Sequence, residues 1–225
     1  MVFAEVSWAK TRLRIATMLC PDHLIIRDTV QKVYRSVGMD VEFLVFPGRR
    51  ALIESSKGHV DAELSRIYEI GLEYKSLARV PTPIFQFAAT VFSKNKNLKI
   101  TNWQVLKPLR IGIMSGMRFS ENNVAGFPDV TVVETPERLF RLLEADRVDV
   151  VIFSRVNGLC MINELGLAAK IFALNPPLEN IDAYHYVHEN HRHLIPLLDE
   201  AVKEIMKKER LETKIQHFLE NSCRM

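Results

Sequence analysis

The sequence has few cysteines and no long apolar run, and both shortages narrow the classes of protein it can represent. Its 225 residues include three cysteines, Cys20, Cys160 and Cys223, which are far apart and lack the CxxC spacing of zinc sites. One pair could form a disulfide in an oxidising compartment, but the favoured expectation is three buried free thiols rather than a dense disulfide framework. No stretch approaches the ~20 apolar residues of a membrane-spanning helix, so we expect no membrane insertion.

Strong net charge and catalytic motifs are also missing. Lys and Arg number 30 against 27 Asp and Glu, and the basic residues are scattered, which argues against a nucleic-acid partner. The sequence has no G-x-S-x-G elbow and no H-E-x-x-H, Walker or G-x-G-x-x-G motif. Ser65 and Ser154 have no visible partner base. We therefore expect neither a hydrolytic centre nor a cofactor.

Four histidines lie close together in the C-terminal part of the sequence. His185, His188, His191 and His193 span a predicted join between a strand and a helix, so their side chains would diverge. Their spacing fits no standard closed metal site. We expect a polar surface at the start of a helix and no bound metal.

The most informative feature that is present is a phrase that occurs twice. It reads VDAELSR at positions 60–66 and, one residue longer, VDVVIFSR at positions 148–155. Each copy follows a helix-like segment and a turn, and each runs as a short apolar strand that ends in Ser-Arg. A strand covered by helices on both faces reads as a continuous apolar run, and ligands collect at the carboxyl ends of such strands. The phrase therefore predicts two α/β lobes, unless the likeness of the copies is coincidental.

Alternating strands and helices are predicted around both copies. The predicted strands are 13–17, 41–46, 84–92, 109–114, 131–133 and 183–187. The predicted helices are 21–37, 50–57, one that follows the turn at 115–117, 138–145, 194–206, and a shorter one that ends near 218. This order predicts an α/β fold with mostly parallel, doubly wound sheets in two lobes that face across a cleft.

The order and spacing of these elements resemble one family. The features that carry the resemblance are Val60-Asp61 before a strand, prolines 81 and 83 before a long strand, Ile111 to Gly116 before a helix, and Val148 to Val151. They are similar to the periplasmic solute-binding proteins of the type II fold, in particular the extracellular family 3 that includes polar amino-acid receptors of ABC transporters. The resemblance extends from about Leu13 to Phe218.

The resemblance implies two lobes joined by a two-stranded hinge that closes on a small ligand. The first lobe would comprise residues 1–92 and 185–225, and the second lobe residues 93–184. The hinge strands would lie near Val91–Ser93 and Tyr184–Tyr186, and the C-terminal helices would return to the first lobe. Such closure is a two-state motion that ligand contacts to both lobes would favour.

The resemblance carries over ligand-binding residues only in part. In amino-acid receptors an aspartate binds the ammonium group of the ligand, and this sequence has Ser154 at that position. At two further positions where the receptors have polar or basic residues, this sequence has Met114 and Met117. Arg66 and Tyr68 lie near the position of the arginine clamp for the carboxylate. The sequence thus predicts a partner for a carboxylate and none for an ammonium group.

Charged residues near the strand ends have two interpretations each. Arg66 and Arg155 could bind a carboxylate through the guanidinium fork, or they could form salt bridges at the surface or between lobes. Glu63 lies on a strand that should be buried, where an unpaired carboxylate is costly. We expect it to pair with Arg66, Arg49 or another nearby arginine, Arg50; the alternative is ligand contact.

Two further groups of residues are candidates for the ligand site. The first group is a turn that leads into a helix and comprises Ser115, Gly116, Met117, Arg118 and Phe119. It could bind an anion through its backbone N–H groups and Arg118, or it could be an ordinary helix start. The second group comprises Met18, Phe46, Tyr68 and Phe85. These residues would line the rim of the cleft if the resemblance holds, or they could belong to the hydrophobic core.

The amino terminus carries a weak export signal. Val2-Phe3-Ala4 has the small-residue pattern that a signal peptidase reads, although no apolar segment precedes it. Either the sequence begins near the end of a trimmed signal or the match is chance. With the resemblance, the expectation is an exported, periplasmic protein whose signal is largely absent from the sequence.

Three functions remain as hypotheses. The leading one is a monomeric receptor that closes on a small, carboxylate-bearing ligand and presents it to an ABC permease or a membrane sensor. The second is an enzyme on the same fold, similar to the cyclohexadienyl and arogenate dehydratases, with Glu63 as the general acid. The third is a ligand-sensing partner of a signalling protein.

Overall fold

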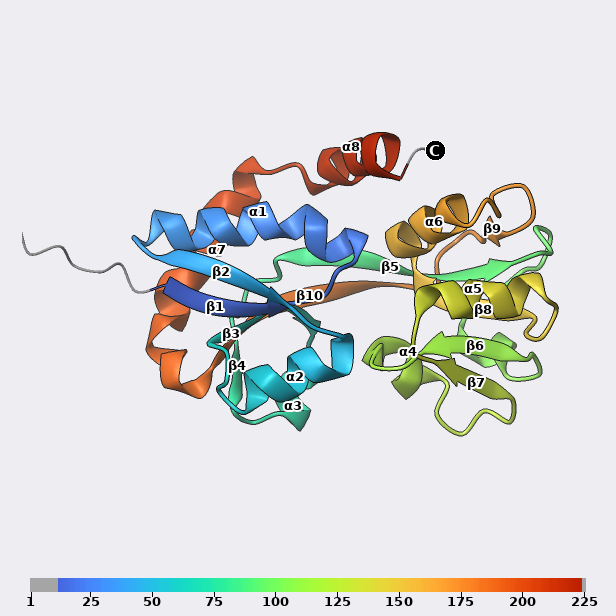
Figure 1. The fold of residues 1–225 in the computed structure, drawn as a ribbon, viewed down its shortest axis with the longest axis horizontal. Coiled ribbons are helices and arrows are strands. Elements are labelled where there is room, and N and C mark those ends of the chain that lie inside the picture. The colour runs from blue at the N-terminus through green and yellow to red at the C-terminus, as the bar shows by residue number, and fades with distance from the viewer. Residues whose placement is uncertain (1–11, 224–225) are drawn as a thin grey trace, which may run out of the picture.

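Two lobes joined by two long strands make up the described part of the chain. The computed structural model describes residues 12–223, so the predicted signal remnant at Val2-Phe3-Ala4 lies outside the described residues. Figure 1 shows the first lobe on the left and the second on the right, with β5 (Phe85–Ser93) and β10 (Glu179–His188) running between them. The elements of the first lobe before β5 are β1 (Arg12–Thr17), α1 (Pro21–Ser36), β2 (Asp40–Val45), α2 (Gly48–Ser56), β3 (Ala62–Ile67), α3 (Ile70–Glu73) and β4 (Leu77–Arg79).

The apolar period of α1, the longest helix of the first lobe, explains how this helix packs on the sheet. Pro21 occupies the first turn of α1, where its missing N–H costs no hydrogen bond, and Gly38 reverses the chain beyond the helix with a φ of 78°. One face of α1 buries residues such as Ile26, Val30 and Val33 against the sheet. Each fully buried aliphatic side chain stabilises the fold by about 1.5–3 kcal/mol. Strands β2, β1 and β3 are parallel and adjacent, as predicted.

The second lobe repeats this arrangement. Strands β7, β6 and β8 are parallel and adjacent, and Thr135 accepts a hydrogen bond from the Arg138 backbone N–H at the start of α5. The sequence did not predict α6, which begins at Arg155, directly after β8, and lacks an amphipathic period. The elements are η1 (Trp103–Leu106), β6 (Ile111–Met114), α4 (Arg118–Asn123), β7 (Val130–Val133), α5 (Pro136–Glu144), β8 (Val150–Ser154), α6 (Arg155–Glu164) and β9 (Phe172–Ala173).

The doubled phrase has the same structural role in both lobes. The Asp61 carboxylate accepts a hydrogen bond of 2.7 Å from the backbone N–H of Arg14, next to β3. The Asp149 carboxylate accepts one of 2.9 Å from the backbone N–H of Arg110, next to β8. Each aspartate thus fixes the start of its own strand against the neighbouring parallel strand. The repetition is structural, and the prediction of two similar lobes is confirmed.

The two strands that were predicted to connect the lobes do connect them. The residues through which these strands pair with each other differ from the predicted hinge residues. β5 (Phe85–Ser93) pairs with β10 (Glu179–His188) through residues 85–89 and 179–183. Val91 and Phe92 already pair with β8 of the second lobe, and Tyr184 and Tyr186 pair with β3 of the first. The predicted hinge residues therefore lie at opposite ends of the passage.

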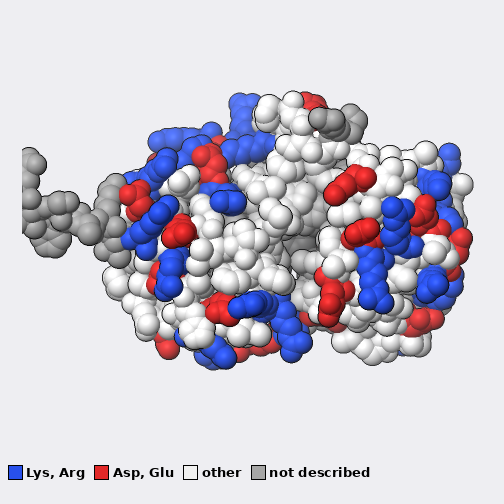
Figure 2. Space-filling model, viewed as in Figure 1, with Lys and Arg blue, Asp and Glu red and all other residues white. Residues whose placement is uncertain are grey.

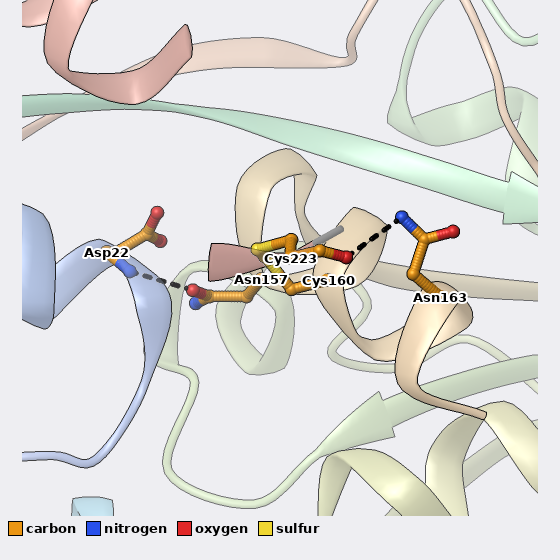
Figure 3. Close-up of a disulfide and its surroundings, with 5 residues drawn as sticks. All are labelled: Asp22, Asn157, Cys160, Asn163 and Cys223. Atoms are coloured by element: carbon orange, nitrogen blue, oxygen red, sulfur yellow. Dashed lines mark hydrogen bonds between the residues drawn. A yellow bond between two sulfur atoms is a disulfide. The ribbon is translucent and has the colours of Figure 1, made fainter. Parts of the chain in front are cut away.

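The C-terminal helices complete the molecule. η2 (Glu189–Leu194) leads into α7 (Ile195–Lys208), which packs on α1 of the first lobe, and α8 (Leu211–Ser222) packs against both α1 and α6. A disulfide joins Cys160 in α6 to Cys223 at the end of α8, with Cα atoms 4.8 Å apart (Figure 3). The prediction of three free thiols is therefore wrong: Cys20 is the one free cysteine among the described residues. The packing of α8 across both lobes brings the two distant thiols together.

The surface carries charges of both signs. Lys, Arg, Asp and Glu side chains are spread over both lobes, and the surface is hollowed where the lobes meet (Figure 2). Between residues 12 and 223, no helix combines the length and apolar character needed to cross a membrane.

Candidate ligand-binding site

A small cavity lies between the two lobes. Its volume is about 70 Å³, well below the ~300–1,000 Å³ of pockets for drug-sized ligands, so in this arrangement it holds only a small molecule. Most of the side chains around it are apolar. The lining residues are Met18, Cys20, Asp22, His23, Ser65, Arg66, Ile67, Ile70, Phe85, Phe87 and Ala183 from the first lobe and the connecting strands, and Gly116, Met117, Arg118, Phe119, Ser154 and Asn157 from the second lobe.

Asp22 is the acidic side chain of this cavity. It lies in the first turn of α1, where the helix dipole favours a negative charge, and only 7% of its surface is exposed. Its backbone N–H donates a 2.9 Å hydrogen bond to Oδ1 of Asn157 in α6, which ties the two lobes together (Figure 3). Burial raises the pKa of the Asp22 carboxyl to about 7, and nearby Ser154 and Asn157 lower it by less.

Two polar atoms in the cavity have no hydrogen-bond partner within the described part of the chain. They are Oδ1 of Asp22, from the first lobe, and Oγ of Ser154, from the second. Ser154 stands near enough to affect the pKa of Asp22, yet the two atoms do not meet the geometry of a hydrogen bond. Buried polar atoms are nearly always partnered in folded proteins, so these two atoms are open to a partner from outside the described part of the chain.

Two ionisable groups next to Asp22, His23 and Cys20, are uncharged near neutral pH. His23 Nδ1 accepts a 3.0 Å hydrogen bond from the Met18 backbone N–H and lies 3.0 Å from Oγ1 of Thr17. Burial, with the charge of Arg66, lowers the pKa of His23 to about 3. Burial, with the charge of Asp22, raises the pKa of the Cys20 thiol to about 12. A protonated thiol is a poor nucleophile, so Cys20 lines the cavity as an inert side chain.

The prediction that Glu63 pairs with an arginine is confirmed. Glu63 is fully buried on β3, where its carboxylate accepts hydrogen bonds from Nε of Arg66 at 2.8 Å and from Oγ of Ser55 at 3.0 Å. Nη2 of Arg66 also donates to the Gly48 carbonyl at 2.8 Å. These bonds use two of the five N–H groups of the guanidinium, which lines the cavity. Glu63 itself is not among the lining residues.

Three backbone N–H groups of the turn before α4 have acceptors inside the protein. The backbone N–H of Ser115 donates to Val133, and that of Met117 donates to Met114. The Gly116 N–H donates to the Glu121 carboxylate at 2.8 Å. The N–H groups of these three residues have acceptors inside the protein and are not free for an anion.

Arg118 connects the lobes. Its Nη1 donates to Glu121 in the same helix at 3.1 Å, and its Nη2 forms an ion pair with Glu73 of α3 in the first lobe. The guanidinium thus contacts two carboxylates of the protein while its side chain lines the cavity. This ion pair links α4 of the second lobe to α3 of the first.

The structure divides the predicted site residues into two groups. Those that line the cavity are Met18, Arg66, Phe85, Gly116, Met117, Arg118, Phe119 and Ser154. Those that lie outside it are Phe46, Arg49, Glu63, Tyr68, Ser115 and Arg155. Among the latter, Phe46 packs beside α2, Tyr68 contacts both Tyr184 and Arg79, and Arg155 donates a hydrogen bond to Asn175.

Sequence reasoning missed Asp22 and Asn157. A signal for Asp22 was available, because an acidic residue in the first turn of a helix that follows a strand end faces the ligand edge of the sheet. Asn157 gave none, since the helix that carries it was not predicted.

The four histidines form no metal site. His185 is buried, with Nε2 2.8 Å from the Tyr34 hydroxyl, and burial lowers its pKa to about 4. His188 is also buried, beneath Gly58, so the expectation of a polar surface is wrong for both. His191 pairs with Asp61. Within residues 12–223, no cluster of three or more His, Cys, Asp or Glu side chains could hold a metal ion.

Comparisons with known proteins agree with this architecture. No protein-family model matches the sequence. A protein of Shewanella oneidensis described as uncharacterized is 27% identical over 181 residues, which cover 78% of this chain and 68% of that protein.

Three solved structures show the fold. The ligand-binding core of GluR0 in complex with L-glutamate has a TM-score of 0.79 at 13% identity, covering 94% of this chain and 99% of that one. A histidine kinase sensor domain with similarity to periplasmic binding proteins has a TM-score of 0.75 at 15% identity, covering 93% and 96%. The amino acid ABC transporter substrate-binding protein AbpA of Streptococcus pneumoniae, bound to L-arginine, has a TM-score of 0.74 at 14% identity, covering 95% and 97%. These neighbours are binding proteins and a sensor domain, and the chain has the two-lobed fold of the type II periplasmic solute-binding proteins.

Proposed function

We propose that this protein is a receptor that binds a small molecule in the cavity between its lobes. The observation that carries the proposal is the pair of buried, unpartnered polar atoms, Oδ1 of Asp22 and Oγ of Ser154, which face the same cavity from opposite lobes. A ligand that satisfies both atoms contacts both lobes at once. Its binding free energy therefore favours the closed arrangement over the open one.

The ligand has an apolar body and carries a carboxylate. Phe85, Phe87, Met117 and Phe119 supply apolar and aromatic surface to the cavity. The guanidinium of Arg66 binds the carboxylate of the ligand. It does so through the N–H groups that do not bond to Glu63 or Gly48. The small cavity volume favours a compact metabolite over a peptide.

The receptor acts outside the cytoplasm, in the periplasm, as a monomer. The Cys160–Cys223 disulfide supports export, since disulfides persist in oxidising compartments such as the periplasm. Its membrane partner is an ABC permease or a membrane sensor; the neighbours by fold include a substrate-binding protein of an ABC transporter and a histidine kinase sensor domain. Uptake of a labelled ligand that depends on a permease would establish transport; a ligand-dependent change in a sensor's output would establish signalling.

Thermal unfolding with a broad panel of metabolites tests the receptor proposal. A ligand at 100 times its dissociation constant stabilises the folded state by about 2.7 kcal/mol, which corresponds to about 5–10 °C for a chain of this size. The Ser154→Leu variant, which fills the cavity, should lose the shift. The matched Ser222→Leu variant, at an exposed position on α8, should keep it. A broad panel that produces no shift, and no closure by small-angle scattering, would contradict the proposal.

The dehydratase alternative loses its proposed acid in this structure. Glu63 is fully buried, bonded to Arg66 and Ser55, and absent from the cavity lining. A general acid must reach the leaving group of the substrate. Turnover of prephenate or arogenate by the purified protein would nevertheless establish the enzyme and displace the receptor proposal.

A further inference from the structure

The Cys160–Cys223 disulfide joins two helices that belong to different parts of the molecule. Cys160 lies in α6, which follows β8 of the second lobe directly, and Cys223 follows the last residue of α8. The two cysteines are 63 positions apart in the sequence, and their Cα atoms are 4.8 Å apart. The Asn163 side chain of α6 also donates a hydrogen bond of 3.3 Å to the Cys223 carbonyl (Figure 3). The end of α8 is therefore fixed to the second lobe.

The beginning of α8 is fixed to the first lobe. Lys214 donates a hydrogen bond of 2.9 Å to Oγ1 of Thr29 in α1. Lys32 of α1 forms an ion pair of 3.1 Å with Glu209, which lies in the connection between α7 and α8. The apolar face of α8 packs against the hydrophobic core that α1 forms with β1 and β3, through Leu211, Ile215, Phe218 and Leu219. Helix α8 thus bridges α1 of one lobe and α6 of the other.

The disulfide makes this bridge a third covalent connection between the lobes. The chain passes from the first lobe to the second through β5 and returns through β10 (Figure 1). Without the disulfide, α8 would end the described chain and contact α6 by noncovalent interactions alone. With it, the segment from Cys160 to Cys223 is a closed covalent ring that runs through both lobes. A movement that separates α6 from α1 must therefore also pull α8 away from α1.

The two sides of the junction between the lobes are held with unequal strength. On the α1–α6 side, Val156 of α6 is 7% exposed within the core of the first lobe, and the Asp22 backbone N–H bonds to Asn157. On the α3–α4 side, the Arg118–Glu73 ion pair links the lobes, and its side chains are 34% and 46% exposed. Exposed ion pairs contribute little, because solvent screens them and ordering two long side chains costs entropy. The α3–α4 side is therefore the one that separates more easily.

We propose that the Cys160–Cys223 disulfide restrains the relative movement of the lobes by holding α6 next to α1, so that the cleft opens at its α3–α4 side. The two cysteines are positioning residues for the cavity, because α6 begins directly after Ser154 and carries Asn157 three positions before Cys160, and both of these polar residues line the cavity. The restraint acts with or without a ligand, so it goes beyond the receptor function and can be tested apart from it.

Distance measurements by double electron–electron resonance test the restraint on each side of the junction. Gadolinium spin labels on a genetically encoded amino acid leave the cysteines untouched. One pair of labels replaces the exposed residues Arg35 of α1 and Glu164 of α6, and the other replaces Leu72 of α3 and Asn122 of α4. In the ligand-free wild type, we expect a narrow distance distribution for the α1–α6 pair and a broader one for the α3–α4 pair. In Cys160→Ser/Cys223→Ser, the α1–α6 distribution should broaden and extend to longer distances.

A matched contrast comes from the opposite side of the junction. Glu73→Gln removes the ion pair with Arg118 and should broaden the α3–α4 distribution while the α1–α6 distribution keeps its width. An α1–α6 distribution that is the same with and without the disulfide would overturn the proposal. A wild type whose two distributions are equally broad would overturn it as well.

Loss of folding and failure of the receptor function have signatures of their own. Circular dichroism shows whether the serine variant is folded, and the distances are measured well below its melting temperature. If it does not fold, the same distances are compared in the folded wild type before and after reduction with tris(2-carboxyethyl)phosphine, with the freed thiols counted by mass spectrometry. A metabolite panel without a binder would contradict the receptor function and leave the distance distributions of the ligand-free protein unaffected.

Discussion

Replacing Asp22 with asparagine should stabilise the protein at neutral and alkaline pH. The substitution keeps the size and shape of the side chain and removes a buried carboxyl whose pKa is raised by burial from its usual value of 3.8 to about 7. A raised pKa means that the folded protein binds this proton more tightly than the unfolded chain does. Stability from this group is therefore complete below pH 3.8 and is lost as the pH rises towards 7.

The size of the effect follows from the shift. One pKa unit is equivalent to about 1.36 kcal/mol, so the shift amounts to a penalty of about 4 kcal/mol for the charged carboxyl above pH 7. At pH 5 the penalty is still only about 1.5 kcal/mol, because most folded molecules hold the proton. The free energy of unfolding of Asp22→Asn relative to the wild type should thus grow by about 3 kcal/mol between pH 5 and pH 8.5.

Urea denaturation of both proteins at a series of pH values measures this difference. The buried histidines His23 and His185 have lowered pKa values, about 3 and about 4, and destabilise the fold as the pH falls below 6.5. They act equally in both proteins and cancel from the difference. Ser222→Ala, at an exposed position that does not titrate, serves as the control and should give a curve parallel to the wild type. Parallel curves for Asp22→Asn as well would refute the reasoning, since the carboxyl would then have a solvated environment or a cationic partner.

Three further predictions concern the covalent link and the close approaches of the chain. Reducing the Cys160–Cys223 disulfide, whose cysteines are 63 positions apart, should lower the free energy of unfolding by about 4 kcal/mol in urea titrations with and without reductant; equal midpoints would contradict this. Gly158→Ala should destabilise the protein by about 1–3 kcal/mol, although alanine has the better helix propensity, because the added Cβ would lie 2.1 Å from the buried Phe92 ring. In the same urea titration, the double variant with Phe92→Leu should recover part of the lost free energy of unfolding. Gly116→Ala should weaken the binding of any compound that raises the melting temperature of the wild type. A φ of 82° is strained for alanine, and the added Cβ would lie 3.3 Å from the backbone of α2 in the other lobe. An unchanged affinity by calorimetry would show that binding does not require Gly116 to lie this close to α2.

Local features of the sequence were sufficient to predict most elements and the pairing of one buried charge. The apolar period of residues 21–37, the proline at its start and the glycine beyond its end indicate α1 without reference to the rest of the chain. Glu63 was expected to pair with an arginine because an unpaired carboxylate in a buried strand is costly, and it pairs with Arg66, three residues away. Both inferences depend on neighbours within one element, where spacing in the sequence fixes distance in space.

Predictions that depended on the surroundings of a side chain were less successful. The turn at 115–119 was a candidate anion site, with an ordinary helix start as the alternative, but Glu121 and two carbonyl groups accept from the N–H groups of Ser115, Gly116 and Met117. His185 was expected at the surface and is instead bonded to Tyr34 inside the first lobe. Neither outcome follows from the residue types, because the partners come from other turns and other strands.

By itself the sequence determined the order of strands and helices, the two-lobed α/β architecture and the doubled phrase that starts the matching strand of each lobe. The tertiary structure alone decided that Cys160 and Cys223 are joined and that Asp22 faces Ser154 across a cavity. The hydrogen bond from Asp22 to Asn157 joins residues 135 positions apart. Such contacts exist only after both lobes have folded and packed, because local periodicity specifies which face of an element is buried, but not which distant element covers it.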